Sequence, residues 1–211
     1  MSPPLKHAGH APADLQSLPM DPRSSPLPTS RRLSYERILR SHAAELEPIL
    51  CDPRVYQFID CDCPTPADLE VSFMHKEAGA PPHRSDEQWL DYAVRLTGSG
   101  VAIGRLEATL LEGRAEVAYL FGPDFWGCGY ATEALAWLHE LIRTKFGVMD
   151  FWATVKPGND RSVRLLERSN YREEPSHTWP RLTSYDPGDL VFRCRAGEDE
   201  TSHRSRALAG K

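Results

Sequence analysis

Two glycines separated by one residue stand just before a helix-forming segment. An apolar run over residues 117–121 leads into a Gly122-Pro123 turn, and Gly127 and Gly129 then precede residues 131–141, which favour a helix. Glycine lets the backbone approach a ligand closely, and the first N–H groups of a helix attract anions together with its dipole. The pattern predicts a phosphate or pyrophosphate site. Taken alone, it also fits a tight turn before a helix.

Two common phosphate motifs do not fit this segment. The dinucleotide fingerprint needs a third glycine where this chain has Thr132, and the Gly-Lys-Ser/Thr run of the P-loop is absent from the sequence. Residues 126–131, Trp-Gly-Cys-Gly-Tyr-Ala, resemble instead the Q/R-x-x-G-x-G/A loop that binds the pyrophosphate of acetyl-CoA in the GNAT acetyltransferase superfamily, except at its first position. The sequence W-G-x-G-Y-A-T-E-A-L is similar to that of the RimJ/RimL-like branch, the GNAT enzymes related to the ribosomal-protein alanine acetyltransferases.

A second motif of the same branch follows about thirty residues later. Residues 155–171 resemble v-x-P-x-N-x-x-S-x-x-x-L-E-x-x-G-F, with Asn159 and Ser162 at the named polar positions. Asn170 replaces the glycine, and asparagine is the residue that best tolerates the left-handed conformation expected there. The resemblance extends over about 27–195. It implies an α+β GNAT fold, whose central, mostly antiparallel mixed sheet is splayed at the acetyl-CoA site and flanked by helices.

The resemblance implies where acetyl-CoA binds. Backbone groups at the end of the strand before the loop pair with the pantetheine amides, and one freed N–H polarises the thioester carbonyl. The loop amides hold the pyrophosphate with help from the Thr132 hydroxyl, and Asn159 hydrogen-bonds on the cofactor side. Cys128 takes part through its backbone. The predicted cofactor-binding residues are Tyr119, Leu120, Phe121, Trp126, Gly127, Cys128, Gly129, Tyr130, Ala131, Thr132 and Asn159.

Two proton transfers require side chains. Many GNAT enzymes protonate the leaving thiolate with a tyrosine at the position that is Leu166 here, so Ser162 is the substitute candidate, although it fits a first-turn helix position equally well. Glu116, which matches an acid of the branch, is the first candidate for the base that deprotonates the amine, and Glu107 is the second. Each is also consistent with an outward-facing strand carboxylate.

The resemblance predicts an acetyl-CoA-dependent N-acetyltransferase in which a primary amine attacks the thioester directly in a ternary complex. An α-amine has a pKa of about 8 and a lysine about 10.4, so a modest base finds an α-amine easier to use. The expected acceptor is therefore a protein N-terminus or a small-molecule amine. The alternative is a catalytically idle acyl-CoA-binding or sensor module of the same fold, which the missing tyrosine favours.

Composition bounds the remaining possibilities. The net charge of −5 in 211 residues gives no support for a nucleic-acid partner, and no apolar run is long enough for a membrane span. Five irregularly spaced cysteines are no disulfide framework, and Cys61-Asp-Cys63 has no second ligand pair nearby, so no metal is expected. Without a signal-peptide pattern, we expect a cytoplasmic monomer or homodimer.

The pattern of apolar, capping and turn residues predicts the helices and strands that must position these side chains. Residues 1–27 form a Pro-rich leader expected to be disordered and 196–211 a flexible tail, with the GNAT domain at 28–195 between them. A first strand is predicted at 32–39, a helix capped by Ser41 to residue 50, and a helix capped by Thr65 to about 76. Then come an antiparallel meander (89–96, 101–111, 116–121), a helix (131–145), a strand (149–155), a helix (161–168) and a final hairpin (171–181 with 190–194).

The groove that binds the acceptor is expected to be formed by residues 57–66 and 77–86. A third hypothesis makes the leader an interaction segment for an aromatic-grooved partner.

Overall fold

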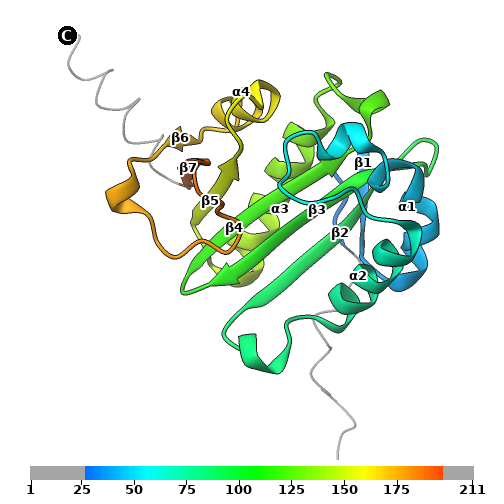
Figure 1. Ribbon diagram of the computed structural model, residues 1–211, viewed down its shortest axis with the longest axis horizontal. Coiled ribbons are helices and arrows are strands. Elements are labelled where there is room, and N and C mark those ends of the chain that lie inside the picture. The colour runs from blue at the N-terminus through cyan, green and yellow to red at the C-terminus, as the bar shows by residue number, and fades with distance from the viewer. Residues whose placement is uncertain (1–26, 197–211) are drawn as a thin grey trace, which may run out of the picture.

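A mixed sheet with the strand order β1-β2-β3-β4-β5-β7-β6 forms the centre of the protein (Figure 1). The computed structural model describes residues 27–196, so the predicted leader up to residue 26 and the tail from residue 197 lie outside the described residues. The strands are β1 (Leu33–Arg37), β2 (Gln88–Leu96), β3 (Ala102–Leu111), β4 (Arg114–Phe121), β5 (Asp150–Val155), β6 (Arg172–Glu173) and β7 (Leu190–Arg195). The helices are α1 (Ala43–Leu50), α2 (Pro66–Ala78), α3 (Tyr130–Phe146) and α4 (Asp160–Arg168).

The sheet splays open between β4 and β5. These two strands run parallel and pair from Arg114↔Asp150 to Glu116↔Trp152, after which they separate. The strands on either side of this junction are antiparallel to their neighbours. The predicted meander and the predicted splayed α+β sheet are therefore confirmed.

Helices cover both faces of the sheet. In Figure 1, α1 and α2 lie in front of β2 and β3, and α3 crosses behind. Strand side chains alternate between faces, so Leu106 and Ala108 pack in the core with α3, whereas Ala93 packs with α1 and α2. The ring of Trp137 on α3 stacks on Tyr35 of β1 with centroids 3.6 Å apart, which fixes α3 against the sheet.

Several local predictions are confirmed by backbone geometry. Thr65 and Asp68 form a capping box at the start of α2, and α3 ends at Gly147 with φ 68°. Asn170 has φ 65°, the left-handed conformation expected of the residue that replaces glycine.

Among the described residues no group of His, Cys, Asp or Glu is arranged to hold a metal ion, and no helix is long and apolar enough to cross a membrane.

Two predictions about element ends were wrong. Ser41 does not cap α1, because a 3-10 turn, Arg40–His42, precedes the helix; the Leu39 amide donates to His42 Nδ1 at 2.9 Å and holds that turn. The strand predicted over 171–181 is only Arg172–Glu173. Pro175 lacks the N–H that a longer ladder needs, so the chain leaves the sheet there and returns at β7.

Candidate functional site

The glycine loop has the conformation that an anion cradle requires. Gly127 and Gly129 have φ of 75° and 76°, and Gly129 is the residue from which α3 begins. A Cβ added at Gly127 would meet no atom within 4 Å, so open space lies over the loop. The loop lines a cavity of about 750 Å³ together with Trp126 and Thr132. The loop therefore has the room and the backbone conformation to accept a pyrophosphate group.

Arg32 holds this loop from behind. Its Nη1 donates to the Cys128 carbonyl at 3.0 Å, and its Nε pairs with Glu133 at 2.7 Å. Burial would raise the pKa of Glu133, but hydrogen bonds from Ser30 and Arg32 lower it. The carboxylate thus ties the first turn of α3 to the segment of Ser30 and Arg32.

The end of β4 presents backbone groups to the splayed gap. Gly122 N–H donates to Ile103 O at 3.0 Å, so antiparallel alternation turns the backbone groups of Leu120 toward β3 and those of Tyr119 toward β5. Phe121 O on the same side accepts from Trp126 Nε1 at 2.7 Å. Of the three residues predicted to pair with pantetheine, Tyr119 therefore has its backbone groups facing the gap.

A second cavity, of about 540 Å³, begins in this gap and extends over the sheet. On its α4 side, Asn159 Oδ1 accepts from the Ser162 amide at 3.3 Å and caps α4. The Ser162 side chain and the Tyr119 phenol lie near each other at this wall, and burial raises the pKa of Tyr119 to about 12. The end of β4 and the start of α4 thereby line one wall of the cavity together, a proximity that sequence reasoning missed because the two elements are far apart in the chain.

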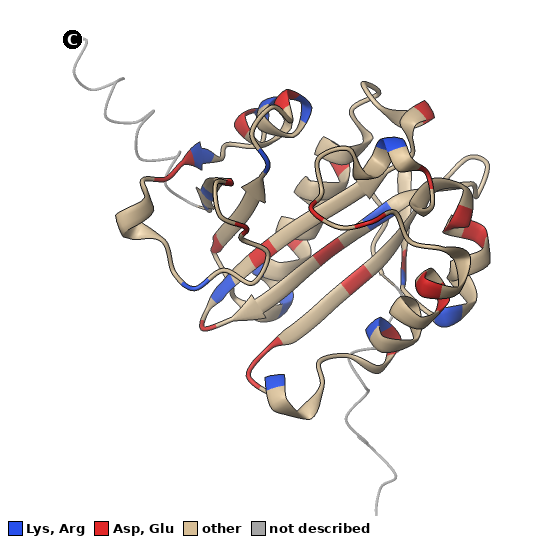
Figure 2. Cartoon of the chain, in the orientation of Figure 1, with Lys and Arg blue, Asp and Glu red and all other residues tan. Residues whose placement is uncertain are grey.

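On the sheet side the cavity wall contains a cluster of paired charges. Glu107 accepts from Lys76 and from Arg105, each at 2.8 Å, and Asp91 opposite it on β2 contacts Lys76 at 2.7 Å. Burial would raise the pKa of Glu107, but the charges of Arg105 and Lys76 hold it well below its usual range. Burial and the neighbouring Glu107 raise the pKa of Asp91 to about 6. Figure 2 shows these acidic positions beside one another on the central strands.

Glu116, the first candidate base, lies in a different environment. Its carboxylate accepts from the amides of Thr183 and Ser184 at 2.8 and 2.6 Å and from both of their hydroxyls. It lines a smaller cavity of about 210 Å³ rather than the one in the gap, whereas Glu107 lines both. Glu116 is therefore engaged in holding the segment between β6 and β7.

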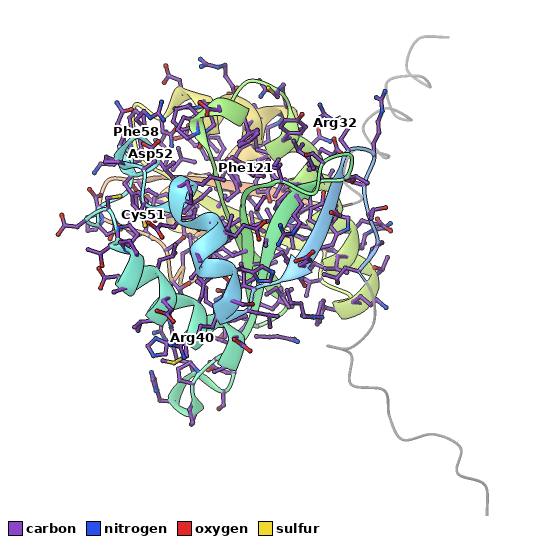
Figure 3. All side chains as sticks on the ribbon, turned by 90° about the vertical axis from the view of Figure 1, so that its right-hand side faces the viewer. Arg32, Arg40, Cys51, Asp52, Phe58 and Phe121 are labelled. Atoms are coloured by element: carbon purple, nitrogen blue, oxygen red, sulfur yellow. The ribbon has the colours of Figure 1, made fainter. Side chains whose placement is uncertain are left out.

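Two chain segments close the large cavity on its outer side. Residues 54–56, 58–62 and 64, which include most of the predicted 57–66 segment, line it, and Lys156 pairs with Asp60 across its edge. Figure 3 shows Phe58, Asp52 and Cys51 together on this side of the molecule, with Phe121 nearer its centre. The predicted 77–86 loop does not line this cavity; Ser184, Asp186 and Asp189 do. The Pro-Gly turn at 187–188 was the sequence signal for a loop there.

Comparison with known proteins shows which family has this sequence and fold. The acetyltransferase (GNAT) domain family matches residues 32–172. The chain belongs to the GNAT acetyltransferase family. Its members use acetyl-CoA, and the glycine loop and splayed strands are the features that would accommodate it here. An uncharacterised N-acetyltransferase, p20 of Bacillus licheniformis, is 36% identical over 63 residues, which are 30% of this chain and about a third (35%) of that protein's length.

Solved GNAT structures have the same fold. An aminoglycoside acetyltransferase AAC(6')-Ib in complex with coenzyme A superposes with a TM-score of 0.63 at 18% identity, covering 81% of this chain and 99% of that one. RimL, a ribosomal L7/L12 α-N-protein acetyltransferase in complex with coenzyme A, gives 0.62 at 15% identity, covering 80% and 97%. These superpositions establish the fold, and identities this low leave the acceptor open.

Proposed function

We propose that the protein is an acetyl-CoA-dependent N-acetyltransferase that transfers the acetyl group to a primary amine by direct attack in a ternary complex. The observation that carries the proposal is the gap between β4 and β5, from which one cavity leads to the glycine loop and another to the paired charges around Glu107. A thioester donor lying in the gap would meet an acceptor entering from the sheet side. We further infer kinship with the RimJ/RimL-like branch from the two sequence motifs.

On the donor side, residues of the chain bind the pyrophosphate and polarise the thioester carbonyl. The amides of residues 127–131 and the Thr132 hydroxyl hold the pyrophosphate, and Arg32 keeps the loop in place through Cys128 O. The Tyr119 N–H, directed toward β5, is the hydrogen-bond donor for the thioester carbonyl, a contribution of roughly 3–4 kcal/mol in other acyl-transfer sites. The thioester supplies the activated acetyl group.

On the acceptor side, Glu107 rather than Glu116 is the carboxylate that faces the large cavity. Because its two cationic partners lower its pKa, Glu107 is a weak base that orients an amine better than it deprotonates one. A weak base favours an acceptor with a low pKa. An α-amine, with a pKa of about 8, therefore fits this site better than a lysine at about 10.4.

The leaving sulfur requires a proton. Leu166, at the position of the usual tyrosine, is buried and apolar, so it supplies none. Ser162 and Tyr119 both line the same cavity, and we assign to Ser162 the relay of a proton to the thiolate: its hydroxyl gives a proton to the sulfur and takes up the one that the attacking amine loses. Loss of such a positioned group typically costs 10²–10⁴-fold in rate.

The test is turnover with matched acceptors. Purified protein and acetyl-CoA are incubated with a peptide bearing a free α-amine and no lysine, with the same peptide blocked at its N-terminus and carrying one lysine, and with small polyamines. We expect thiol release and an acetylated product with the free α-amine. Release only with the blocked lysine peptide would contradict the α-amine assignment.

The second candidate function is an idle acyl-CoA-binding module. The engagement of Glu116 by four hydrogen bonds and the buried Leu166 favour it. Saturable acetyl-CoA binding without thiol release across the whole amine panel would select this function over catalysis.

A further inference from the structure

Helix α4 presents a row of arginines to the cavity beside the glycine loop. Arg161, Arg164 and Arg168 are three and four positions apart, so they share one face of the helix, and all three line the cavity of about 750 Å³. Leu166, on another side of the helix, is buried in the core, and Leu165 lines the cavity floor beside the arginines. Figure 2 shows α4 at the edge of the molecule, with both basic and acidic positions on it.

These arginines are not used within the described part of the chain to neutralise carboxylates. The Arg161 guanidinium lies over the Trp126 ring, 3.5 Å from its centroid, and no ion pair involves Arg164 or Arg168 among residues 27–196. By contrast, Arg143 on α3 pairs with Glu140 one turn away. The same cavity has one carboxylate in its wall, Asp160, so the wall carries an excess of positive charge.

The position of the row relative to the gap indicates which part of a ligand it meets. A donor anchored on the glycine loop must direct its thioester toward the gap between β4 and β5, which the 540 Å³ cavity occupies. The other end of the donor then extends away from the gap. Arg164 and Arg168 line only the 750 Å³ cavity on that far side, whereas Arg161 lines both.

The charge there exceeds what the pyrophosphate requires. Backbone N–H groups of the loop and of the first turn of α3 already provide an anion site for the pyrophosphate. Coenzyme A carries a further phosphomonoester on its ribose, and such a group has a charge of about −1.5 to −2 at pH 7. Planar guanidinium groups bind phosphate oxygens through paired N–H donors.

Resting on the proposed use of acetyl-CoA, we propose that Arg161, Arg164 and Arg168 form a recognition site for the ribose 3′-phosphate of coenzyme A. Arg164 and Arg168 bind the phosphate oxygens, and the contact with Trp126 holds Arg161 at the inner end of the row. The protein then binds coenzyme A in preference to dephospho-coenzyme A.

The experiment compares these two ligands by titration calorimetry in the full-length protein. We expect wild type to bind coenzyme A roughly tenfold more tightly than dephospho-coenzyme A, a modest ratio because the arginines are exposed. In the Arg164→Gln/Arg168→Gln variant the ratio should fall to near one with dephospho-coenzyme A affinity unchanged. Added salt should reduce the wild-type ratio, since it screens exposed charges.

An Arg31→Gln/Arg172→Gln variant is the matched control. It removes the same charge from two exposed positions that line none of the three cavities, and should keep the wild-type ratio. Equal binding of both ligands by wild type, or equal weakening of both in the α4 variant, would overturn the 3′-phosphate site while leaving the proposed function standing. Binding of neither ligand would overturn the proposed function as well.

Discussion

Replacing Glu116 by glutamine tests whether this carboxylate has a structural role, as an anchor for a chain segment, or a catalytic role, as a base. In the native protein the two carboxylate oxygens accept two amide and two hydroxyl hydrogen bonds from Thr183 and Ser184. A glutamine keeps one accepting oxygen and places an NH₂ donor against the other pair. Two of the four hydrogen bonds are therefore lost, and the segment between β6 and β7, which closes the acceptor cavity, is held less firmly.

The size of the effect follows from those contacts. Hydrogen bonds to a charged acceptor contribute about 1.5–3 kcal/mol when sheltered and less when exposed, and one of the lost partners is a hydroxyl that can turn to water. A cost of about 1–2 kcal/mol for holding the segment corresponds to a factor of roughly 5–30 in its opening equilibrium. Amide hydrogen exchange at Thr183 and Ser184 should accelerate by that factor.

Kinetics test the same anchor. We expect Glu116→Gln to raise the KM of the acceptor, because Ser184, Asp186 and Asp189 line its cavity, while the pH dependence of kcat stays unchanged. A Thr183→Val/Ser184→Ala control removes the two hydroxyl donors, leaves the carboxylate in place, and should raise the acceptor KM in the same direction. The reasoning is refuted if Glu116→Gln abolishes a limb of the pH–rate profile while amide exchange at Thr183 and Ser184 is unchanged.

Three further substitutions and titrations check the site and the fold. Gly127→Asp puts a charge into the open space over the loop and should abolish the acetyl-CoA-induced rise in Tm, whereas Gly113→Asp, with a similar φ of 77° and likewise no neighbour within 4 Å, should incur a comparable strain of about 1–2 kcal/mol and keep that rise. Gly104→Ala would place a Cβ 2.4 Å from a β4 carbonyl oxygen and should lower the free energy of unfolding in urea by about 1–3 kcal/mol or more, whereas Gly98→Ala, in open space, should change it little. Burial lowers the pKa of His139 from 6.5 to about 4, so the unfolded chain binds a proton at a higher pH than the folded protein does. The free energy of unfolding should therefore fall by up to about 3 kcal/mol as the pH drops from 6.5 to about 4. If the free energy of unfolding of His139→Phe varied with pH as steeply as that of wild type, this reasoning would be contradicted.

Features that depend on local chain geometry were predictable from sequence alone. Gly127 and Gly129 identify positions that need positive φ, Asn170 identifies a third, and the Thr65–Asp68 spacing identifies a helix start, because each is set by sterics or hydrogen bonds within a few residues. The hairpin signals Gly98-Ser-Gly100 and Glu112-Gly113 predicted the meander for the same reason. The resemblance of the two motifs, in their order, to those of the GNAT superfamily predicted the family and the fold, and it is also the basis of the proposed donor loop at residues 126–131.

Contacts between distant segments were decided only by the tertiary structure. Glu116 and Ser184 are 68 positions apart and Lys76 and Glu107 are 31 apart, so no local pattern records that the first carboxylate is an anchor and that the second is paired. Sheet register and the packing of α2 and the 174–189 segment determine both. The function of a carboxylate depends on which charges and donors surround it, and those neighbours exist only once the chain has folded.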